Sequence, residues 1–149
     1  ALAADLIIAS TAARFWLPEA QLGMLPDSGG LLRLPKAIPA RLAREMILTG
    51  RRLEADEALA LNLVNRVVEP EGLLASAMEL AEAIARSAPL AVTAARDILR
   101  ATEGVEVEQG YTLMRSGAIQ SYRAMLASDD VLEGPRAFAE GRAPKWKGR

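Results

Sequence analysis

Short apolar runs separated by polar turns characterise the beginning of the chain. Two such runs occupy residues 6–9 and 13–17, with the polar turn Ser10-Thr11-Ala12 between them. A third run covers residues 63–68 and is stopped by Pro70. Apolar runs of this length bounded by turn residues are typical of strands, so each run predicts a short β-strand.

Helical periodicity replaces this pattern over most of the remaining chain. A helix is expected to start at Pro39 and to end at Gly50, because glycine favours a helix C-terminus. The acidic segment 54–57 fits the first turn of a short helix, where the helix dipole favours negative charge. Beyond residue 70 apolar residues recur at steps of three and four, which predicts amphipathic helices. The clearest stripe consists of Leu73, Leu74, Ala77, Leu80, Ala81 and Ile84.

Three more helices are expected near the C-terminus. One starts around Ser87 and Pro89, and a longer one runs from about residue 105 to residue 126 with one apolar face. Ser128 is expected to cap the last helix, which Gly134-Pro135 should bend or interrupt.

Strands are thus expected mainly at the start of the chain, with one more at residues 63–68, and helices over the rest. We divide the chain into a strand-bearing core, residues 1–54, and a mostly helical oligomerisation region, residues 55–149. Because the helices have little sheet to cover, they must either pack together or cover a neighbouring subunit.

Composition narrows the possible chemistry. The 149 residues carry a formal net charge of −1, which gives no electrostatic reason to expect nucleic acid or an anionic membrane as a partner. The chain contains neither cysteine nor histidine, so disulfides, thiolate nucleophiles and Ser-His-Asp sites are excluded. Acid–base chemistry must therefore use carboxylates, lysine or tyrosine. We expect no metal, and we expect a cytoplasmic protein.

Residues 15–34 hold the strongest candidates for this chemistry. Glu19 and Asp27 lie in a turn region flanked by apolar residues, and Gly29-Gly30 follows. An apolar environment disfavours the charged form of a carboxylate, which makes it useful for proton transfer. A glycine pair lets backbone N–H groups approach a ligand closely. By spacing alone the simpler interpretation is favoured, in which Glu19 ends a strand and the glycines belong only to a turn.

Spaced motifs run through the whole chain in a fixed order. They include Ala1-Leu2-Ala3-Ala4-Asp5, Leu17-Pro18-Glu19, Leu22-Gly23, Gly29-Gly30, Arg33-Leu34-Pro35, Leu48-Thr49-Gly50, Leu63-Val64-Asn65-Arg66-Val67-Val68 and Trp146-Lys147-Gly148-Arg149. In this order they resemble the crotonase (enoyl-CoA hydratase/isomerase) superfamily. The resemblance implies the α/β crotonase-like (ClpP/crotonase spiral) fold, of which this chain would be the mostly helical C-terminal portion with a few short strands. Residues 1–5 are expected to end a helix, and a substantial N-terminal part is expected to precede them.

The resemblance also implies a reaction. Crotonase-type enzymes bind acyl-CoA thioesters, and two backbone N–H groups hold the thioester oxygen. In the hydratase branch two glutamates handle the water and the α-proton. Glu19 matches the second of these acids, which exchanges a proton with the α-carbon. The first glutamate and both oxyanion donors would lie upstream of Ala1.

Binding residues follow from the same resemblance. The substrate is expected to contact Trp16, Leu25, Pro26, Asp27, Gly29 and Gly30. Trp16 would hold a cationic acyl group with its ring face or, as the favoured alternative, pack in the core. Asp27 would assist acid–base work or cap the following helix.

The basic C-terminal tail has two interpretations. Arg142, Lys145 and Lys147 would bind the CoA phosphates and adenine, or they would only keep a solvated tail soluble. CoA is expected as part of the substrate, with no separate cofactor.

We expect the full-length protein to be an acyl-CoA hydratase or dehydratase that assembles as a homotrimer or as a dimer of trimers, and we expect this chain alone to be inactive. Pro26-Asp27-Ser28-Gly29-Gly30, Arg115-Ser116-Gly117 and Glu133-Gly134-Pro135 resemble the branch that acts on crotonobetainyl-CoA and carnitinyl-CoA. A double-bond isomerase is the nearest alternative. The other is an inactive, truncated crotonase that serves only as an assembly module, because the chain on its own would lack the oxyanion donors.

Overall fold

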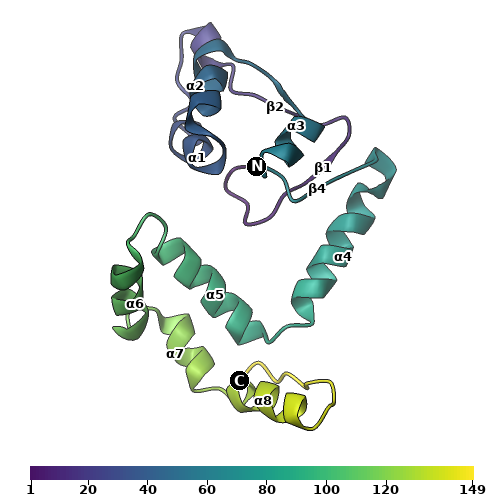
Figure 1. Ribbon diagram of the computed structural model, residues 1–149, viewed down its shortest axis with the longest axis vertical. Coiled ribbons are helices and arrows are strands. Elements are labelled where there is room, and N and C mark those ends of the chain that lie inside the picture. The colour runs from purple at the N-terminus through teal and green to yellow at the C-terminus, as the bar shows by residue number, and fades with distance from the viewer. The chain divides into compact units, whose positions relative to one another are not determined.

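The computed structural model describes all residues from 1 to 149, which form two compact units (Figure 1). The first unit comprises residues 1–79 and the second residues 80–149. The sequence predicts a boundary after residue 54. The structure divides the chain later, after residue 79, because α3 (Ala55–Ala60) and β4 (Arg66–Val68) both pack against strands of the first unit. That the helical part mediates oligomerisation stays a prediction.

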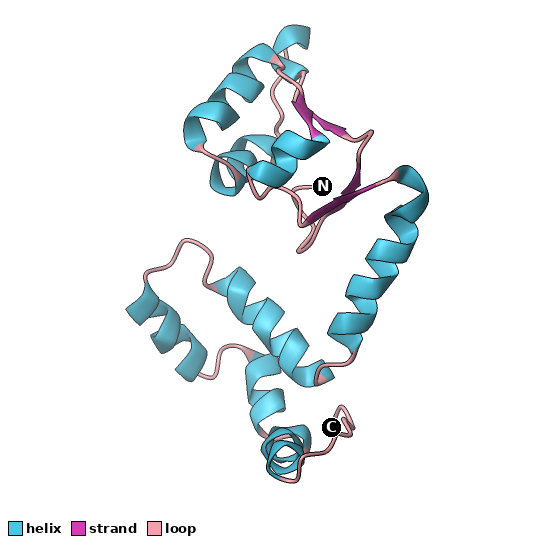
Figure 2. Ribbon diagram, turned by 45° about the vertical axis from the view of Figure 1, so that its right-hand side comes forward, coloured by secondary structure: helices cyan, strands magenta, loops and turns pink.

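Strands occur only in the first unit (Figure 2). β1 (Ile8–Ser10) pairs in parallel with β4, and β2 (Arg14–Phe15) pairs antiparallel with β3 (Leu53–Glu54). The three expected runs therefore all contain strands, although each strand is shorter than its apolar run. Residues 1–5 form a turn rather than the expected helix end, and the Ala4 N–H donates to the Ala1 carbonyl oxygen.

Helices of the first unit build its core. A 3₁₀ turn, η1 (Glu19–Leu22), precedes α1 (Gly30–Ala37) and α2 (Ala40–Thr49). α2 confirms the helix expected between Pro39 and Gly50, and Gly50 adopts the left-handed conformation (φ 67°) typical of a helix end. The core contains the buried residues Ala9, Leu34, Ile38, Ala43, Met46, Ile47, Leu53, Ala58, Leu63 and Val64.

A second 3₁₀ turn, η2 (Pro70–Gly72), leads into α4 (Leu73–Ala85), which confirms the helix predicted from the apolar stripe. The second unit then contains α5 (Pro89–Ala101), α6 (Val107–Arg115), α7 (Gln120–Leu126) and α8 (Asp130–Ala139). No helix combines the length and the apolar character that crossing a membrane requires.

Three expectations for this unit are wrong in whole or in part. The single helix over 105–126 is two helices, because Gly117 adopts φ 80° and the Ser116 hydroxyl donates to the Leu113 carbonyl, which ends α6. Ser128 does not cap α8, since its hydroxyl donates back to Met125 O. Nor does Gly134-Pro135 interrupt α8, which runs through Pro135, and a bend at this position stays a prediction.

Candidate active site

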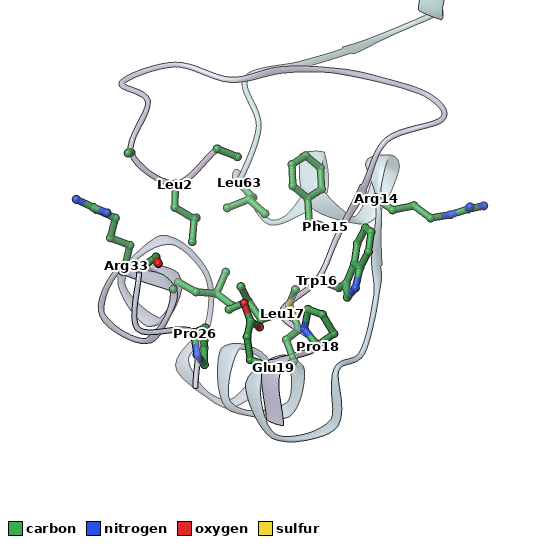
Figure 3. Close-up of a pocket in the computed structure, with 17 residues that line it drawn as sticks. Leu2, Arg14, Phe15, Trp16, Leu17, Pro18, Glu19, Pro26, Arg33 and Leu63 are labelled. Atoms are coloured by element: carbon green, nitrogen blue, oxygen red, sulfur yellow. The ribbon is translucent and has the colours of Figure 1, made fainter. Parts of the chain in front are cut away.

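A cavity of about 470 Å³ lies in the first unit beside Glu19 (Figure 3). Its wall is mainly apolar and comes from the N-terminal turn, β2, η1, α1 and α2. The apolar lining includes Leu2, Phe15, Trp16, Leu17, Pro26, Leu34, Met46 and Leu63. Clefts of this size with an apolar wall and few polar groups are typical of sites for small molecules and cofactors.

Glu19 is the only carboxylate residue in the lining. It is the first residue of η1, and its side chain is directed toward the cavity (Figure 3). Its Oε2 atom is buried and has no hydrogen-bond partner. A buried polar atom without a partner is unfavourable for stability and therefore needs an explanation, which at such sites is often a functional one.

Backbone geometry holds the Glu19 turn closed. The Glu19 carbonyl oxygen accepts the Met24 N–H at 2.9 Å, and Gly23 ends the turn with φ 72°. A side chain at Gly23 would have to adopt this left-handed conformation, which is unfavourable for most residues. The sequence Glu19 to Gly23 thus encodes a tight turn that presents the carboxylate from its first position.

Gly30 allows Pro26 and Leu17 to approach closely in the cavity wall. A Cβ atom at Gly30 would lie 2.9 Å from Cβ of Pro26 and 3.1 Å from both methyl groups of Leu17, and all three residues line the cavity. Gly30→Ala is therefore expected to destabilise the protein by about 1–3 kcal/mol through overpacking. Gly72→Ala is the matched control, because a Cβ there would meet only Val68 at 4.0 Å. Urea denaturation of both variants measures the difference, and equal stabilities would contradict this packing.

The structure brings together four of the six predicted substrate residues. Trp16, Pro26, Gly29 and Gly30 line the cavity with Glu19. Leu25 and Asp27 do not line it, and both are exposed.

Asp27 does not cap the following helix. Gly29 occupies the N-cap position of α1, and no side chain makes a capping hydrogen bond there. The capping interpretation of Asp27 is therefore wrong, because the helix starts two residues later than a cap at Asp27 would require. Its part in acid–base chemistry stays a prediction.

Trp16 is a cavity residue rather than a core residue. Its exposed fraction of 44% contradicts the core-packing interpretation. The guanidinium carbon of Arg52 lies 5.2 Å from the centroid of its ring. Trp16 therefore already attracts a cation, as the ring quadrupole favours.

Several cavity residues carried no signal in the sequence. Met46 and Leu63 line the cavity from α2 and from the segment before β4, and only the tertiary fold brings them there. Arg33 also lines the cavity, and its Nη1 atom approaches Gly29 so closely that a Cβ there would be 2.4 Å away. The i, i+4 spacing of Gly29 and Arg33 at the start of a helix is a signal that could have found this contact.

The basic tail is fixed in the second unit. Arg142 makes a bidentate ion pair with Glu133, with N–O distances of 2.6 and 3.0 Å, and also pairs with Glu140. Lys147 Nζ lies 3.1 Å from Asp129. These contacts hold the tail against α8 while Arg142, Lys145 and Lys147 stay exposed, so the interpretation as a solvated tail stays a prediction. Whether Arg142, Lys145 and Lys147 contact CoA stays a prediction.

Glu133 makes the second unit sensitive to acid. The hydrogen bond from Arg142, together with the backbone N–H of Lys145, lowers the pKa of Glu133 from 4.5 to about 2. A carboxyl group with a lowered folded-state pKa stabilises the fold above pH 4.5, and this contribution disappears as the pH falls toward 2. We expect the second unit to lose stability as the pH falls through this window. Glu133→Gln should make the stability of this unit depend less on pH. Thermal unfolding between pH 5 and pH 2 tests this, with Glu108→Gln as control. Parallel curves for wild type and Glu133→Gln would contradict it.

Solved enoyl-CoA hydratase structures have the same fold as this chain. The crystal structure of enoyl-CoA hydratase from Mycobacterium tuberculosis H37Rv matches 99% of this chain with a TM-score of 0.88 and 40% identity, over 57% of that protein. The enoyl-CoA hydratase of Bacillus anthracis matches 99% of this chain with a TM-score of 0.90 and 38% identity, over 56% of that protein. These matches confirm the crotonase-like fold.

The family follows from the sequence match. The model of the enoyl-CoA hydratase/isomerase family matches residues 1–149, and the chain belongs to this family. It is 58% identical over all 149 residues to carnitinyl-CoA dehydratase of Proteus mirabilis (strain HI4320) and 55% identical to that of Salmonella typhi. In both cases the chain spans 57% of the length of the relative. The similarity to carnitinyl-CoA dehydratases agrees with the branch indicated by the sequence motifs.

Proposed function

We propose that the protein with this chain is an acyl-CoA hydratase or dehydratase that adds water reversibly to an α,β-unsaturated acyl-CoA thioester. The observation that carries the proposal is the buried, unpartnered Oε2 of Glu19, the only carboxylate residue in a mainly apolar cavity. Membership of the enoyl-CoA hydratase/isomerase family supports it.

Glu19 would move the proton of the α-carbon. In hydration the water oxygen bonds to the β-carbon and gives one of its protons to a base, which the family resemblance assigns to a glutamate upstream of Ala1. The double bond is lost, and the α-carbon gains a proton from the Glu19 carboxylic acid. Dehydration runs in reverse, so that the Glu19 carboxylate removes this proton. No electrons are transferred, so the proposal needs no redox cofactor, and CoA enters as part of the thioester substrate.

We further propose crotonobetainyl-CoA, the dehydration product of carnitinyl-CoA, as the substrate. The names of the relatives support this choice, and the exposed Trp16 ring supports it because such a ring attracts cations. Comparing kcat/KM for crotonobetainyl-CoA and crotonyl-CoA tests it. At least a tenfold preference for crotonobetainyl-CoA is expected, roughly what 1.4 kcal/mol of cation–π attraction provides. Equal values, or a preference for crotonyl-CoA, would contradict this substrate.

Double-bond isomerisation is the second candidate. One carboxylate suffices to move a proton between two carbons, and Glu19 is the only carboxylate residue that lines the cavity. The products differ, since isomerisation yields a shifted double bond and no hydroxyl group. A purely structural assembly module would give neither product. The homo-oligomeric state and the cytoplasmic location stay predictions.

A further inference from the structure

Residues 49–52, which are the last residue of α2 and the short loop after it, contact the chain on both sides of Glu19. On the C-terminal side, Gln21 Nε2 donates a hydrogen bond of 2.5 Å to the Thr49 carbonyl oxygen. Thr49 is the last residue of α2, where the carbonyl groups lack partners within the helix. The side chain of Gln21 therefore ties the Glu19 turn to the end of α2.

Gly50 makes this contact possible. A Cβ atom at Gly50 would lie 2.8 Å from the amide carbon of Gln21, and Gly50 also has φ 67°. Two independent features thus require glycine here, because a side chain would both clash with Gln21 and strain the backbone. The Gln21 amide lies directly against the backbone at this position.

On the N-terminal side, Arg52 stacks on the ring of Trp16, three residues before Glu19. The antiparallel pairing of Phe15 with Leu53 in β2 and β3 brings the two residues together. Trp16 and Gln21 thus flank Glu19, and each contacts the same four-residue loop.

The loop itself is anchored at two places. Arg51 makes ion pairs with Glu45 of α2 at 3.0 Å and with Glu57 of α3 at 2.6 Å. The Thr49 hydroxyl donates to the Glu45 carbonyl and accepts the Arg51 N–H. Residues 49–52 are therefore fixed to two helices while they contact the Glu19 segment.

We propose that residues 49–52 form a positioning loop, which orients the Glu19 carboxylate through Gln21 and Arg52. The proposal rests on the proposed function of Glu19. Oε2 of Glu19 has no hydrogen-bond partner, so a hydrogen bond to Oε2 does not fix the direction of the carboxylate. A backbone held on both sides supplies this orientation, and Gln21 and Arg52 are the positioning residues.

Gln21→Met tests the loop directly, because methionine has nearly the same shape and lacks the amide donor. Loss of one hydrogen bond of about 0.5–1.5 kcal/mol corresponds to about two- to tenfold faster local opening. The Met24 N–H, which bonds to the Glu19 carbonyl oxygen, should exchange with solvent faster by this factor. Exchange of the Ala43 N–H within α2 should stay unchanged. Gln109→Met on the exposed surface of α6 is the matched control.

Turnover separates positioning from stability alone. Gln21→Met is expected to lower kcat for hydration several-fold and to leave KM unchanged, since the substrate contacts remain. If Gln21→Met fails to fold, Arg52→Leu takes its place. This variant removes the stack on Trp16 and should also lower kcat. Faster Met24 exchange without a fall in kcat would overturn the proposal, as would unchanged Met24 exchange in both variants.

The exchange measurement does not depend on turnover. If the full-length wild-type protein that contains this chain gives no hydration product, the proposed function fails, and Met24 exchange in the two variants still decides whether the loop holds the turn.

Discussion

Replacement of Glu19 by glutamine is expected to lower kcat for acyl-CoA hydration by about 10²–10⁴-fold, the usual contribution of a general acid or base. Glutamine keeps the size and shape of the side chain but cannot give up or accept the α-proton. The effect should fall on kcat more than on KM, because the apolar wall that contacts the substrate is unchanged. Steady-state hydration of crotonyl-CoA measures both constants.

The Glu19→Gln variant should be folded and about as stable as the wild type. Oε2 has no hydrogen-bond partner, so an amide of the same shape breaks no hydrogen bond of that atom. Glu108→Gln, on the exposed surface of α6, controls for the loss of one charge and should retain full activity. If Glu19→Gln kept kcat within threefold of wild type, Glu19 would not be the proton carrier.

Replacement of Asp130 by alanine is expected to destabilise the second unit by about 2–4 kcal/mol. The Asp130 carboxylate is buried and accepts the backbone N–H groups of Lys147 at 2.7 Å and Gly148 at 2.9 Å. Alanine would leave both donors without their partner, and hydrogen bonds to a charged group contribute about 1.5–3 kcal/mol each. The tail would then detach from α8.

Asp129→Ala is the matched control for this variant. Asp129 is the neighbouring residue, but its side chain is 63% exposed and makes an ion pair with Lys147, which should contribute less than about 1 kcal/mol. Unfolding by urea, followed by Trp146 fluorescence in a Trp16→Phe background, reports on the second unit. Equal destabilisation by the two variants would show that Asp130 does not fasten the tail.

The sequence predicted elements well where local signals agreed. The helix from Pro39 to Gly50 has a defined start, an apolar face and a glycine at its end, and the structure confirms it as α2. The region 105–126 shows the opposite case, because a continuous apolar stripe concealed the break at Gly117. Strand pairing was not predictable, since β1 pairs with β4 across more than fifty residues of intervening chain.

The residues of the candidate site also fall into predictable and unpredictable ones. Glu19 was identified from a motif that lies within one short segment. Met46 and Leu63 complete the cavity from distant segments, so no local pattern indicates them. The ion pairs of the tail were not predictable, because the acidic partners of Arg142 and Lys147 are not part of the basic run.

The central claim is that Glu19 exchanges the α-proton during hydration. NMR of the product formed from crotonyl-CoA in D₂O tests it most directly. The wild-type protein should give a β-hydroxy thioester with one deuteron at the α-carbon, and Glu19→Gln should give essentially none in the same time. A product with a shifted double bond and no hydroxyl group, or equal amounts of hydrated product from both proteins, would contradict the claim.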